Sequence, residues 1–473
     1  MTDQLTALQS IFSEFYYWVT VVMMFLIHVG FCMYEVGVSR NKHHQATLMK
    51  NTMVIPLVTI TWFFFGWWIY WAFPTGPGIA ASIIPLADGS LNYGLRTDDG
   101  LFNANSYLAN SPLMGVNLTD HLGGVFWAAF LLFSWTAASI VSGALIERIT
   151  TFAFLILAVA IGSVFWTIDA AWGWHFDGWM LKVLGYHDAY ASGVIHAIAG
   201  GFALGVLIVL GPRIGKFSSS GEPRNIGPRN PWLVTVGLFL IYTGFWGFYA
   251  ACNVPIYNLG PEYGVEGVTF WTATNIYLTP TTLSGITFNF LMSLSGGLLA
   301  GYVISKGDPF WTYSLGLAGV ICASAGNDLY HPIQAMIVGM IGGVIPYKLH
   351  YWVENTFKID DAVGAVAVHG YGGFIGVVIA GFILNGYPSS GYSVGAMWDT
   401  SGTFALINPL GNFLGAIIMF LVLGLIPGYV LAKILNAFGK LRIPREVEIA
   451  GLDYQIMEDD KEAEKAFTST ATR

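Results

Sequence analysis

The sequence predicts an all-α polytopic membrane protein, and composition, apolar runs and the placement of charge support this. Of the 473 residues, 55% are hydrophobic and only 10% are charged, and the mean hydropathy is +0.61. A water-soluble domain of this size cannot bury so much apolar surface, so a bilayer must cover the excess. The 57 glycines agree with this, because helices in lipid pack closely through small residues.

Runs of about 18 or more mostly apolar residues mark the expected spans. The eighth and ninth runs are short and are separated by Asn327, Asp328 and His331. The count of eleven would therefore change by one if these two runs formed a re-entrant pair. The expected spans are 16–38, 52–74, 122–145, 151–171, 190–211, 232–253, 283–304, 310–326, 332–348, 362–385 and 410–435.

Basic residues indicate the orientation of these spans. With eleven spans, all of the 20 Lys and Arg residues except Arg96 and Lys182 fall on one side of the membrane. The positive-inside rule then places the N-terminus outside and the C-terminus in the cytoplasm. We expect a transmembrane domain at 1–440 and a cytoplasmic tail at 441–473, whose charged end is available to a cytosolic partner.

The three cysteines, Cys32, Cys252 and Cys322, lie in or beside apolar stretches. We interpret them as small core residues rather than as a disulfide framework or a metal site. No cofactor, metal or nucleic-acid partner is expected. The longest outer loop, 75–121, contains an Asn117-Leu-Thr119 sequon, a pattern that often arises by chance.

Two histidines stand at matched depths in the predicted membrane. His196 lies eight residues after Asp188 at the outer start of the fifth span, and His369 lies eight residues after Asp361 at the inner start of the tenth. At about 1.5 Å per residue, each is roughly 12 Å deep, near the midplane. Five spans per half would invert the second half, which predicts a five-plus-five inverted repeat plus a final helix. His28 has no such counterpart, and we interpret it as structural.

Such a pair favours the passage of a small cation that can lose a proton. A cation that enters hydrocarbon pays a large desolvation cost. Ammonium can avoid that cost by deprotonation, after which neutral ammonia crosses an apolar lumen and imidazoles carry the proton. Potassium cannot be deprotonated. For a single histidine, a hydrogen-bonded core role would be the better interpretation; the matched depths favour function for the pair.

Four long segments resemble the ammonium transporter family, which is related to the Rhesus glycoproteins. Residues 188–217 (DAYASGVIHAIAGGFALGVLIVLGPRIGKF) and 360–374 (DDAVGAVAVHGYGGF) are similar to the family's two pore-histidine segments. Residues 133–148 (FSWTAASIVSGALIER) resemble its third span, and 323–332 (ASAGNDLYHP) its interrupted eighth and ninth. The resemblance implies a homotrimer with eleven spans and one pore per subunit, located in the plasma or inner membrane.

The resemblance also implies roles for individual residues. Asp188 and Trp172 match the acid and the aromatic wall of the outer cation site, to which Phe133 and Cys252 also contribute. Phe133 and Phe248 match the stacked phenylalanine gate. His196 and His369 match the twin histidines of the pore. Ammonium or methylammonium would be the substrate, and a nitrogen-regulatory signalling protein is a possible cytosolic partner.

The sequence departs from the family pattern at the outer mouth. Tyr249 and Cys252 replace an asparagine and a serine, and the loop before Asp188 is longer, so Trp174 competes for the wall role. Gly364 replaces an acid found in some members. These departures keep two alternatives open: an ammonium-binding sensor with little transport, and a passive ammonia gas channel. An intramembrane enzyme is disfavoured, because no constellation of catalytic residues accompanies the Asp and His pair.

Overall fold

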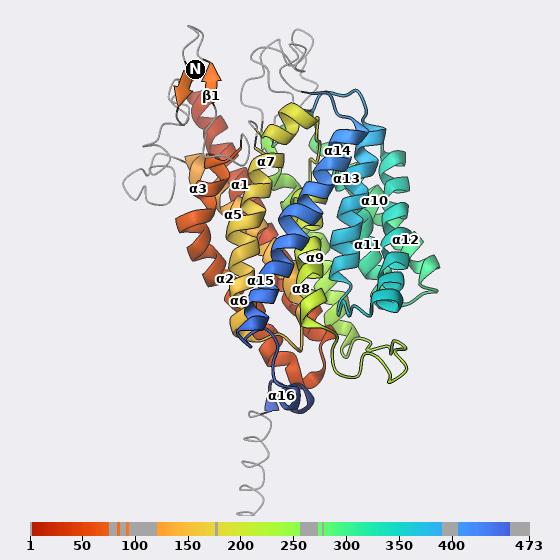
Figure 1. Cartoon of the computed structure of the whole chain (residues 1–473). Helices are drawn as coiled ribbons and strands as arrows, with labels where there is room; N and C mark the ends of the chain where they lie inside the picture. The colour runs from red at the N-terminus through yellow and green to blue at the C-terminus, as the bar shows by residue number, and fades with distance from the viewer. Residues whose placement is uncertain are drawn as a thin grey trace, which may run out of the picture.

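The computed structural model describes residues 2–74, 83–85, 91–93, 121–175, 178–255, 273–276, 279–389 and 405–454. These residues are mostly helical, and the long helices run side by side in a bundle (Figure 1). Within the described ranges, ten helices are long and apolar enough to cross a membrane. They are Ile11–Val38, Asn41–Tyr70, Val125–Leu145, Thr151–Gly173, Ser192–Leu210, Pro231–Ala251, Leu283–Ile304, Pro332–Phe357, Val366–Ile383 and Pro409–Ala437.

Short π-helical or 3-10 turns, labelled η, interrupt or flank several spans. The elements of the first half are α1 (Thr2–Val38), η1 (Asn41–His43), α2 (His44–Thr61), η2 (Trp62–Gly66), α3 (Trp67–Ala72), α5 (His121–Leu145), α6 (Thr151–Ala160), η3 (Ile161–Phe165), α7 (Trp166–Gly173), η4 (Met180–Leu184), η5 (Ser192–Ala197) and α8 (Ile198–Leu210). Those of the second half are α9 (Pro231–Ala251), α10 (Leu283–Ile304), α11 (Pro309–Ser324), α12 (Pro332–Phe357), η7 (Val366–Tyr371), α13 (Gly372–Ile383), α14 (Pro409–Ile417), η8 (Ile418–Leu425), α15 (Ile426–Ala437) and α16 (Arg445–Ala450).

Two small antiparallel sheets accompany the helices. Strand β1 (Ile83–Pro85) pairs with β2 (Leu91–Tyr93). Strands β3 (Asn253–Pro255), β4 (Ala273–Asn275) and β5 (Pro280–Thr281) form the second sheet in the order β3-β4-β5. Because β3 follows the end of α9 directly, this second sheet lies at the end of the span that carries Phe248.

Several spans begin at a capping residue followed by proline. Asn230, Asp308 and Asn408 each accept a hydrogen bond from a backbone N–H of the first turn that follows, and a proline stands next in the chain. Proline at this position loses no hydrogen bond and has the φ angle that a helix needs. Local sequence therefore fixes the starts of α9, α11 and α14, as the predicted boundaries near 232, 310 and 410 anticipate.

Three boundaries differ clearly from the prediction, and the first is that of α1, which begins at Thr2 rather than 16. The second span begins at 41–44 rather than 52, and α12 continues to Phe357 rather than 348. Lys50, expected in a loop, is a buried helical residue whose Nζ donates to the carbonyl oxygen of Ile149 at 3.0 Å. Polar residues lower the mean hydropathy at these helical ends, so a hydropathy scan does not detect them. Contacts inside the protein satisfy the hydrogen-bonding groups of such residues, as for Lys50.

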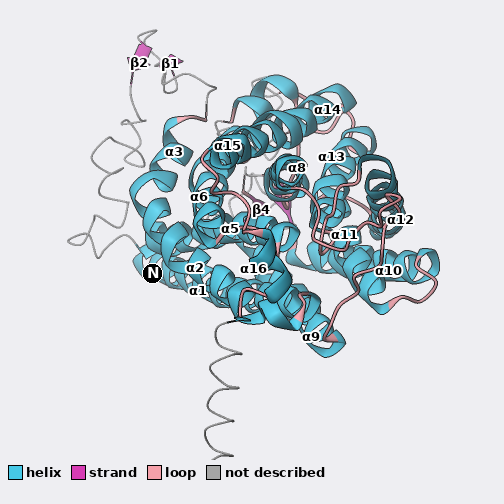
Figure 2. Ribbon diagram, turned by 60° about the horizontal axis from the view of Figure 1, so that its bottom comes forward, coloured by secondary structure: helices cyan, strands magenta, loops and turns pink. Residues whose placement is uncertain are grey.

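The count of spans depends on α11. This helix occupies the eighth predicted position, but with 16 residues it is shorter than the ten spans counted above. It packs against α10, α12 and α13, and most of its side chains are buried. The helix α8, which follows the His196 turn, is likewise enclosed by other helices (Figure 2).

The first part of the predicted tail docks onto the helical bundle. Asp453 accepts hydrogen bonds from the backbone N–H groups of Gln45 and Ala46, at 2.9 and 3.0 Å, and so caps the start of α2. Glu448 accepts from the backbone N–H of Ile214 at 2.6 Å. The charged end of the tail and the Asn117 sequon lie outside the described residues.

Candidate functional site

The structure brings the two predicted pore histidines into direct contact. The Nδ1 atoms of His196 and His369 are 3.0 Å apart, so one donates a hydrogen bond to the other. Their rings are nearly parallel, with centroids 5.1 Å apart. Both side chains are buried, and Nε2 of His196 has no hydrogen-bond partner among the described residues. A proton can therefore pass between the two imidazoles.

Matching local structures hold the two histidines. Each lies in a π-helical turn, η5 or η7, and three residues after the preceding acid the backbone turns left-handed, at Ala191 (φ 71°) and Gly364 (φ 73°). Six residues after the acid, a backbone N–H donates to its carboxylate, at 2.9 Å in the first segment and 3.2 Å in the second. Sequence spacing alone predicted equal depth for the two histidines. The structure adds that the backbone around them has the same local geometry in both segments.

Asp188 is fully buried and holds the backbone of the segment that carries His196. Its carboxylate accepts hydrogen bonds from the backbone N–H groups of Ser192, Gly193 and Val194, at 2.7 to 2.9 Å, and from the Tyr186 hydroxyl at 3.0 Å. Burial raises the pKa of this carboxyl, while these donors oppose the shift by stabilising the ionised form. The carboxylate thus fixes the start of the helix that carries His196.

Glycines allow the two histidine helices to meet. A Cβ atom on Gly200 would lie 2.2 Å from Cα of Gly370, and one on Gly373 would lie 2.1 Å from the carbonyl oxygen of Ser192. Any side chain at either position would push the backbones apart. The predicted close packing of these helices is therefore confirmed, and the contact between the histidines depends on it.

Aromatic rings extend from the histidines towards the predicted outer mouth. The ring of His196 stacks on Phe245 and Phe248, with centroids 5.8 and 5.7 Å away. Phe248 meets Phe133 edge to face, at 4.8 Å and 87°. The structure brings the two predicted gate residues together, but their rings are not stacked on each other. Phe248 stacks instead on Phe245, at 4.9 Å and 13°.

Trp174, rather than Trp172, joins the phenylalanines. Its ring lies 5.1 Å from that of Phe133, and its Nε1 donates to the carbonyl oxygen of Asp188 at 2.7 Å. The half-buried Trp172 packs against Trp179 at 5.7 Å. Of the two tryptophans, Trp174 therefore lies beside the Phe133 ring and Trp172 does not, and the wall role itself stays a prediction.

The two substitutions at the outer mouth have different surroundings. Tyr249 stacks on Tyr190 at 4.2 Å, and its hydroxyl hydrogen-bonds with Ser324 at 2.6 Å and accepts from Asn327 at 2.9 Å. It is therefore anchored between helices. Cys252 is fully buried, and burial raises the pKa of its thiol well above the ordinary value. The thiol stays protonated and can offer a cation only a weak sulfur acceptor.

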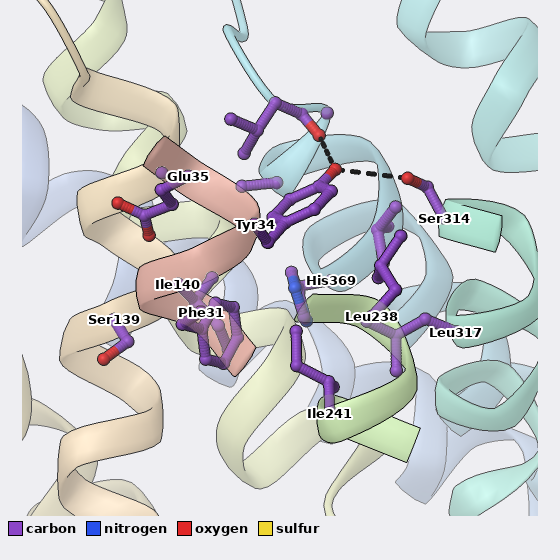
Figure 3. Close-up of a pocket in the computed structure, with 15 residues that line it drawn as sticks. Phe31, Tyr34, Glu35, Ser139, Ile140, Leu238, Ile241, Ser314, Leu317 and His369 are labelled. Carbon is purple, nitrogen blue, oxygen red and sulfur yellow. Dashed lines mark hydrogen bonds between the residues drawn. The ribbon is translucent and has the colours of Figure 1, made fainter. Parts of the chain in front are cut away.

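On the inner side of His369 lies a narrow, mostly apolar cavity (Figure 3). Its free volume of about 10 Å³ is close to what one water molecule occupies. Tyr34 borders it, held by hydrogen bonds with Ser314 at 3.1 Å and with the carbonyl oxygen of Val363 at 2.9 Å. The lining is mostly apolar and includes Phe31, Ile140, Leu238, Ile241 and Leu317, and the carboxylate of Glu35 also borders it.

A larger and more polar cavity follows towards the predicted cytoplasmic side. We call this cavity of about 270 Å³, lined among others by Arg213, Trp311, His350, Glu354 and Asp361, the inner vestibule. Gly364 borders both the vestibule and the narrow cavity. The two cavities are therefore neighbours that share this wall residue.

A buried ion-pair network stabilises the wall of the vestibule. Arg213 donates two hydrogen bonds from its guanidinium to Asp360, at 2.8 and 3.0 Å, and Arg40 pairs with Glu147 at 2.5 Å. Burial alone would raise the pKa of Asp360, but Arg213 and Arg148 together hold it well below the usual range. Asp360 is therefore ionised throughout the neutral and mildly acidic range.

Sequence reasoning missed two buried acids near this site, Asp169 and Glu35, and Glu35 borders the narrow cavity. Asp169 in α7 is fully buried, and neither of its carboxylate oxygens has a partner among the described residues. Only its position inside an apolar span could have drawn attention to it. His28, interpreted as structural, hydrogen-bonds with Ser139 at 3.3 Å and packs edge to face on Trp135.

Comparison with known proteins agrees with this arrangement. A family model described as the Ammonium Transporter Family matches residues 15–462. The ammonium transporter Amt1 of Methanocaldococcus jannaschii is 26% identical over 441 residues, which cover 92% of this chain and 93% of Amt1. Amt2 of the same organism is 28% identical over 465 residues, covering 96% of this chain and 92% of its own length.

Solved structures share the fold. The structure named Sensor Amt Protein has a TM-score of 0.71 at 24% identity, with 94% of this chain and 98% of the other covered. Mep2 of Saccharomyces cerevisiae has a TM-score of 0.64 at 17% identity, with 92% and 88% covered. Because the family match extends over nearly the whole sequence and the membrane helices agree with it, this chain belongs to the ammonium transporter family.

Proposed function

We propose that the protein conducts ammonium by separating it into ammonia and a proton at the outer mouth. Ammonia then passes Phe133 and Phe248 and crosses the apolar lumen, while the proton travels through His196 and His369. The observation that carries this proposal is the 3.0 Å contact between the Nδ1 atoms of the two histidines. It supplies a proton path beside a lumen too apolar for a cation.

Energetics favour separation over passage of the intact cation. An ion that leaves water for an apolar environment without compensation loses many kcal/mol of solvation, whereas neutral ammonia loses only a few hydrogen bonds. The rings of Phe133 and Trp174 give the cation aromatic faces near the mouth, worth about 0.5–2 kcal/mol. This attraction is too small to carry ammonium through the lumen intact.

The same reasoning extends to the topology and the assembly. We propose eleven spans, with α11 counted as the eighth, in a five-plus-five inverted repeat with the N-terminus outside and the C-terminus in the cytoplasm. The matching left-handed residues Ala191 and Gly364 support the repeat. We further propose a homotrimer with one pore per subunit in the plasma or inner membrane, with methylammonium as a second substrate and a cytosolic nitrogen-regulatory protein as partner.

The test is a current measurement on the purified protein. Proteoliposomes on a solid-supported membrane receive an ammonium jump, with potassium and methylammonium jumps as controls. A saturable ammonium current that decays faster at higher protein density supports the proposal. We expect His196→Ala and His369→Ala to abolish this current while size-exclusion elution stays unchanged, because each variant interrupts the proton path. Wild-type currents in both variants would refute the relay.

Two other functions make different predictions for this experiment. The altered outer mouth, with Tyr249 and Cys252, motivates a sensor that binds ammonium with little transport. It would show calorimetric binding without current. A passive gas channel would collapse an ammonia gradient, measured by an internal pH dye, also without current. The direct contact between the histidines favours the proton-coupled route over both.

A further inference from the structure

We propose that His350 is the proton-exit residue of this pore: it receives the proton from His369 and releases it from the inner vestibule. This inference rests on the proposed function and extends it to a side chain on a different helix, α12. His350 lies between two carboxylates, those of Asp361 and Glu354, next to the cavity that His369 borders.

The two cavities provide the route. His369 lines the narrow cavity and His350 lines the vestibule, and Gly364 borders both. A Cβ atom on Gly364 would come within 3.0 Å of the Trp311 ring, so a larger residue here would narrow the junction between them. The narrow cavity has room for about one water molecule, which would stand next to His369, and water in the vestibule would continue the route to His350.

The surroundings of His350 suit a transient positive charge. Its Nδ1 is 3.8 Å from Oδ2 of Asp361, and its Nε2 is 3.9 Å from Oε2 of Glu354. Both distances exceed a direct hydrogen bond but lie within ion-pair reach, so the two carboxylates would stabilise a protonated His350. The ring packs edge to face on Trp311 at 4.8 Å, which fixes its orientation.

Other charged and titratable groups also line this vestibule. Lys216 pairs with Glu354 at 2.6 Å, and Arg213 is held by Asp360, so each of these two cations already has a carboxylate partner. One oxygen of Asp361 accepts from the Ala367 N–H, and the other has no partner among the described residues. The remaining such groups along the wall are Arg224, Asp308 and Tyr351.

The step is a transfer of one proton, and it balances at each stage. Protonated His369 gives a proton to water in the narrow cavity and returns to its neutral form. That water passes a proton on to vestibule water, and from there it reaches a nitrogen of His350, which becomes an imidazolium between the two carboxylates. His350 then releases the proton to vestibule water and is neutral again. An imidazole suits this task because it gains and loses a proton near neutral pH.

The experiment compares the full-length wild type with His350→Gln and His350→Ala. His331→Asn is the matched control, because His331 is an exposed capping residue at the opposite end of α12. Ammonium-jump currents are recorded from proteoliposomes whose internal and external pH are set independently at about 6 and about 8, around the imidazole range. External proteolysis of a C-terminal tag gives the fraction of each orientation.

We expect acidification of the vestibule side to lower the wild-type current, because His350 then keeps its proton longer. His350→Gln should carry roughly ten- to hundredfold less current than the wild type. This loss is no larger than the smallest rate effects of a positioned acid–base group, because water in the vestibule still accepts protons. This residual current should no longer respond to vestibule pH. Added imidazole should restore current to His350→Ala, because position 350 lines the vestibule and the substitution leaves space there. The current of His331→Asn should not change.

Three outcomes would overturn the inference. Wild-type current and pH response in His350→Gln would show that His350 carries no protons. Equal loss of current and thermal stability in both His350 variants, without rescue by imidazole, would assign His350 a packing role. Absence of ammonium current from the wild type would refute the proposed function and the exit together, and this result is distinct from the first two.

Discussion

Gly373 offers the sharpest test of the idea that close helix packing creates the proton path. A Cβ atom in Gly373→Ala would lie 2.1 Å from the carbonyl oxygen of Ser192 and 2.8 Å from the backbone nitrogen of Ala197. Both contacts are with backbone atoms of the opposite histidine segment, which cannot rotate away. The two segments must therefore separate to admit the methyl group.

The structure sets the size of the effect. Relieving the closest contact from 2.1 to about 3.0 Å requires a shift of roughly 0.9 Å. The same shift would lengthen the 3.0 Å contact between His196 and His369 to roughly 3.9 Å, which is beyond a hydrogen bond. Overpacking costs about 1–3 kcal/mol and the lost hydrogen bond about 0.5–1.5 kcal/mol. Misplacement by about 1 Å can lower a rate about 100-fold.

The neighbouring glycine is the matched control. A Cβ atom on Gly372 would meet only ordinary contacts, the nearest being the carbonyl oxygen of Ala318 at 3.6 Å. Gly372→Ala should therefore keep the wild-type ammonium current and melting temperature, while Gly373→Ala loses about 2–4 kcal/mol of stability and most of its current. Both variants are measured in the same detergent and the same proteoliposomes.

Equal behaviour of the two alanine variants would refute the reasoning. If Gly373→Ala conducts and melts like Gly372→Ala, the segments tolerate separation and the contact between the histidines is not the limiting feature. If Gly373→Ala loses stability but keeps its current, the close packing serves the fold and the proton takes another route.

The remaining predictions concern the outer mouth and the inner network. Trp174→Ala should lower the saturable ammonium current about tenfold or more, because it removes the ring beside Phe133 and a buried hydrogen bond. Trp172→Ala should change this current little. If Trp172→Ala lowered the current more than Trp174→Ala, the aromatic wall of the cation site would be assigned to Trp172. Asp188→Ala should abolish uptake, because three backbone N–H groups at the start of the His196 helix lose their acceptor; normal uptake would contradict this role. Asp360→Asn should cost about 3–5 kcal/mol, because buried Arg213 and Arg148 lose the negative charge of their shared carboxylate partner. Because the folded-state pKa of Asp360 is lowered, its contribution is present above about pH 4 and lost as the pH falls further, so melting curves of wild type and variant should converge in acid.

The sequence was most informative where function depends on spacing along one helix. Hydropathy located the spans, and the eight residues between acid and histidine predicted the same depth for both histidines, which their direct contact supports. The glycines that follow each histidine indicated close packing, which the contacts at Gly200 and Gly373 confirm. Periodicity and depth are properties of one segment, so they can be read before any partner is known.

Features that depend on contacts between distant segments could not be predicted in the same way. The start of α2 at His44 depends on Asp453, a residue more than 400 positions later, which supplies its cap. The choice between Trp172 and Trp174 depends on how the chain turns after α7. Hydropathy gives no account of either, because the deciding atoms belong to other parts of the chain.

The departures at the outer mouth acquire a physical meaning only from the structure. Tyr249 stands where the family has an asparagine. Its hydroxyl hydrogen-bonds with Ser324 and Asn327 and its ring stacks on Tyr190, so this side chain holds neighbouring segments together. Cys252 remains protonated and weakly polar. The mouth therefore offers a cation aromatic faces with little polar coordination. Under the proposed function, such a site would attract ammonium while stabilising its charge poorly, and weak stabilisation of the cation would favour its deprotonation before the lumen.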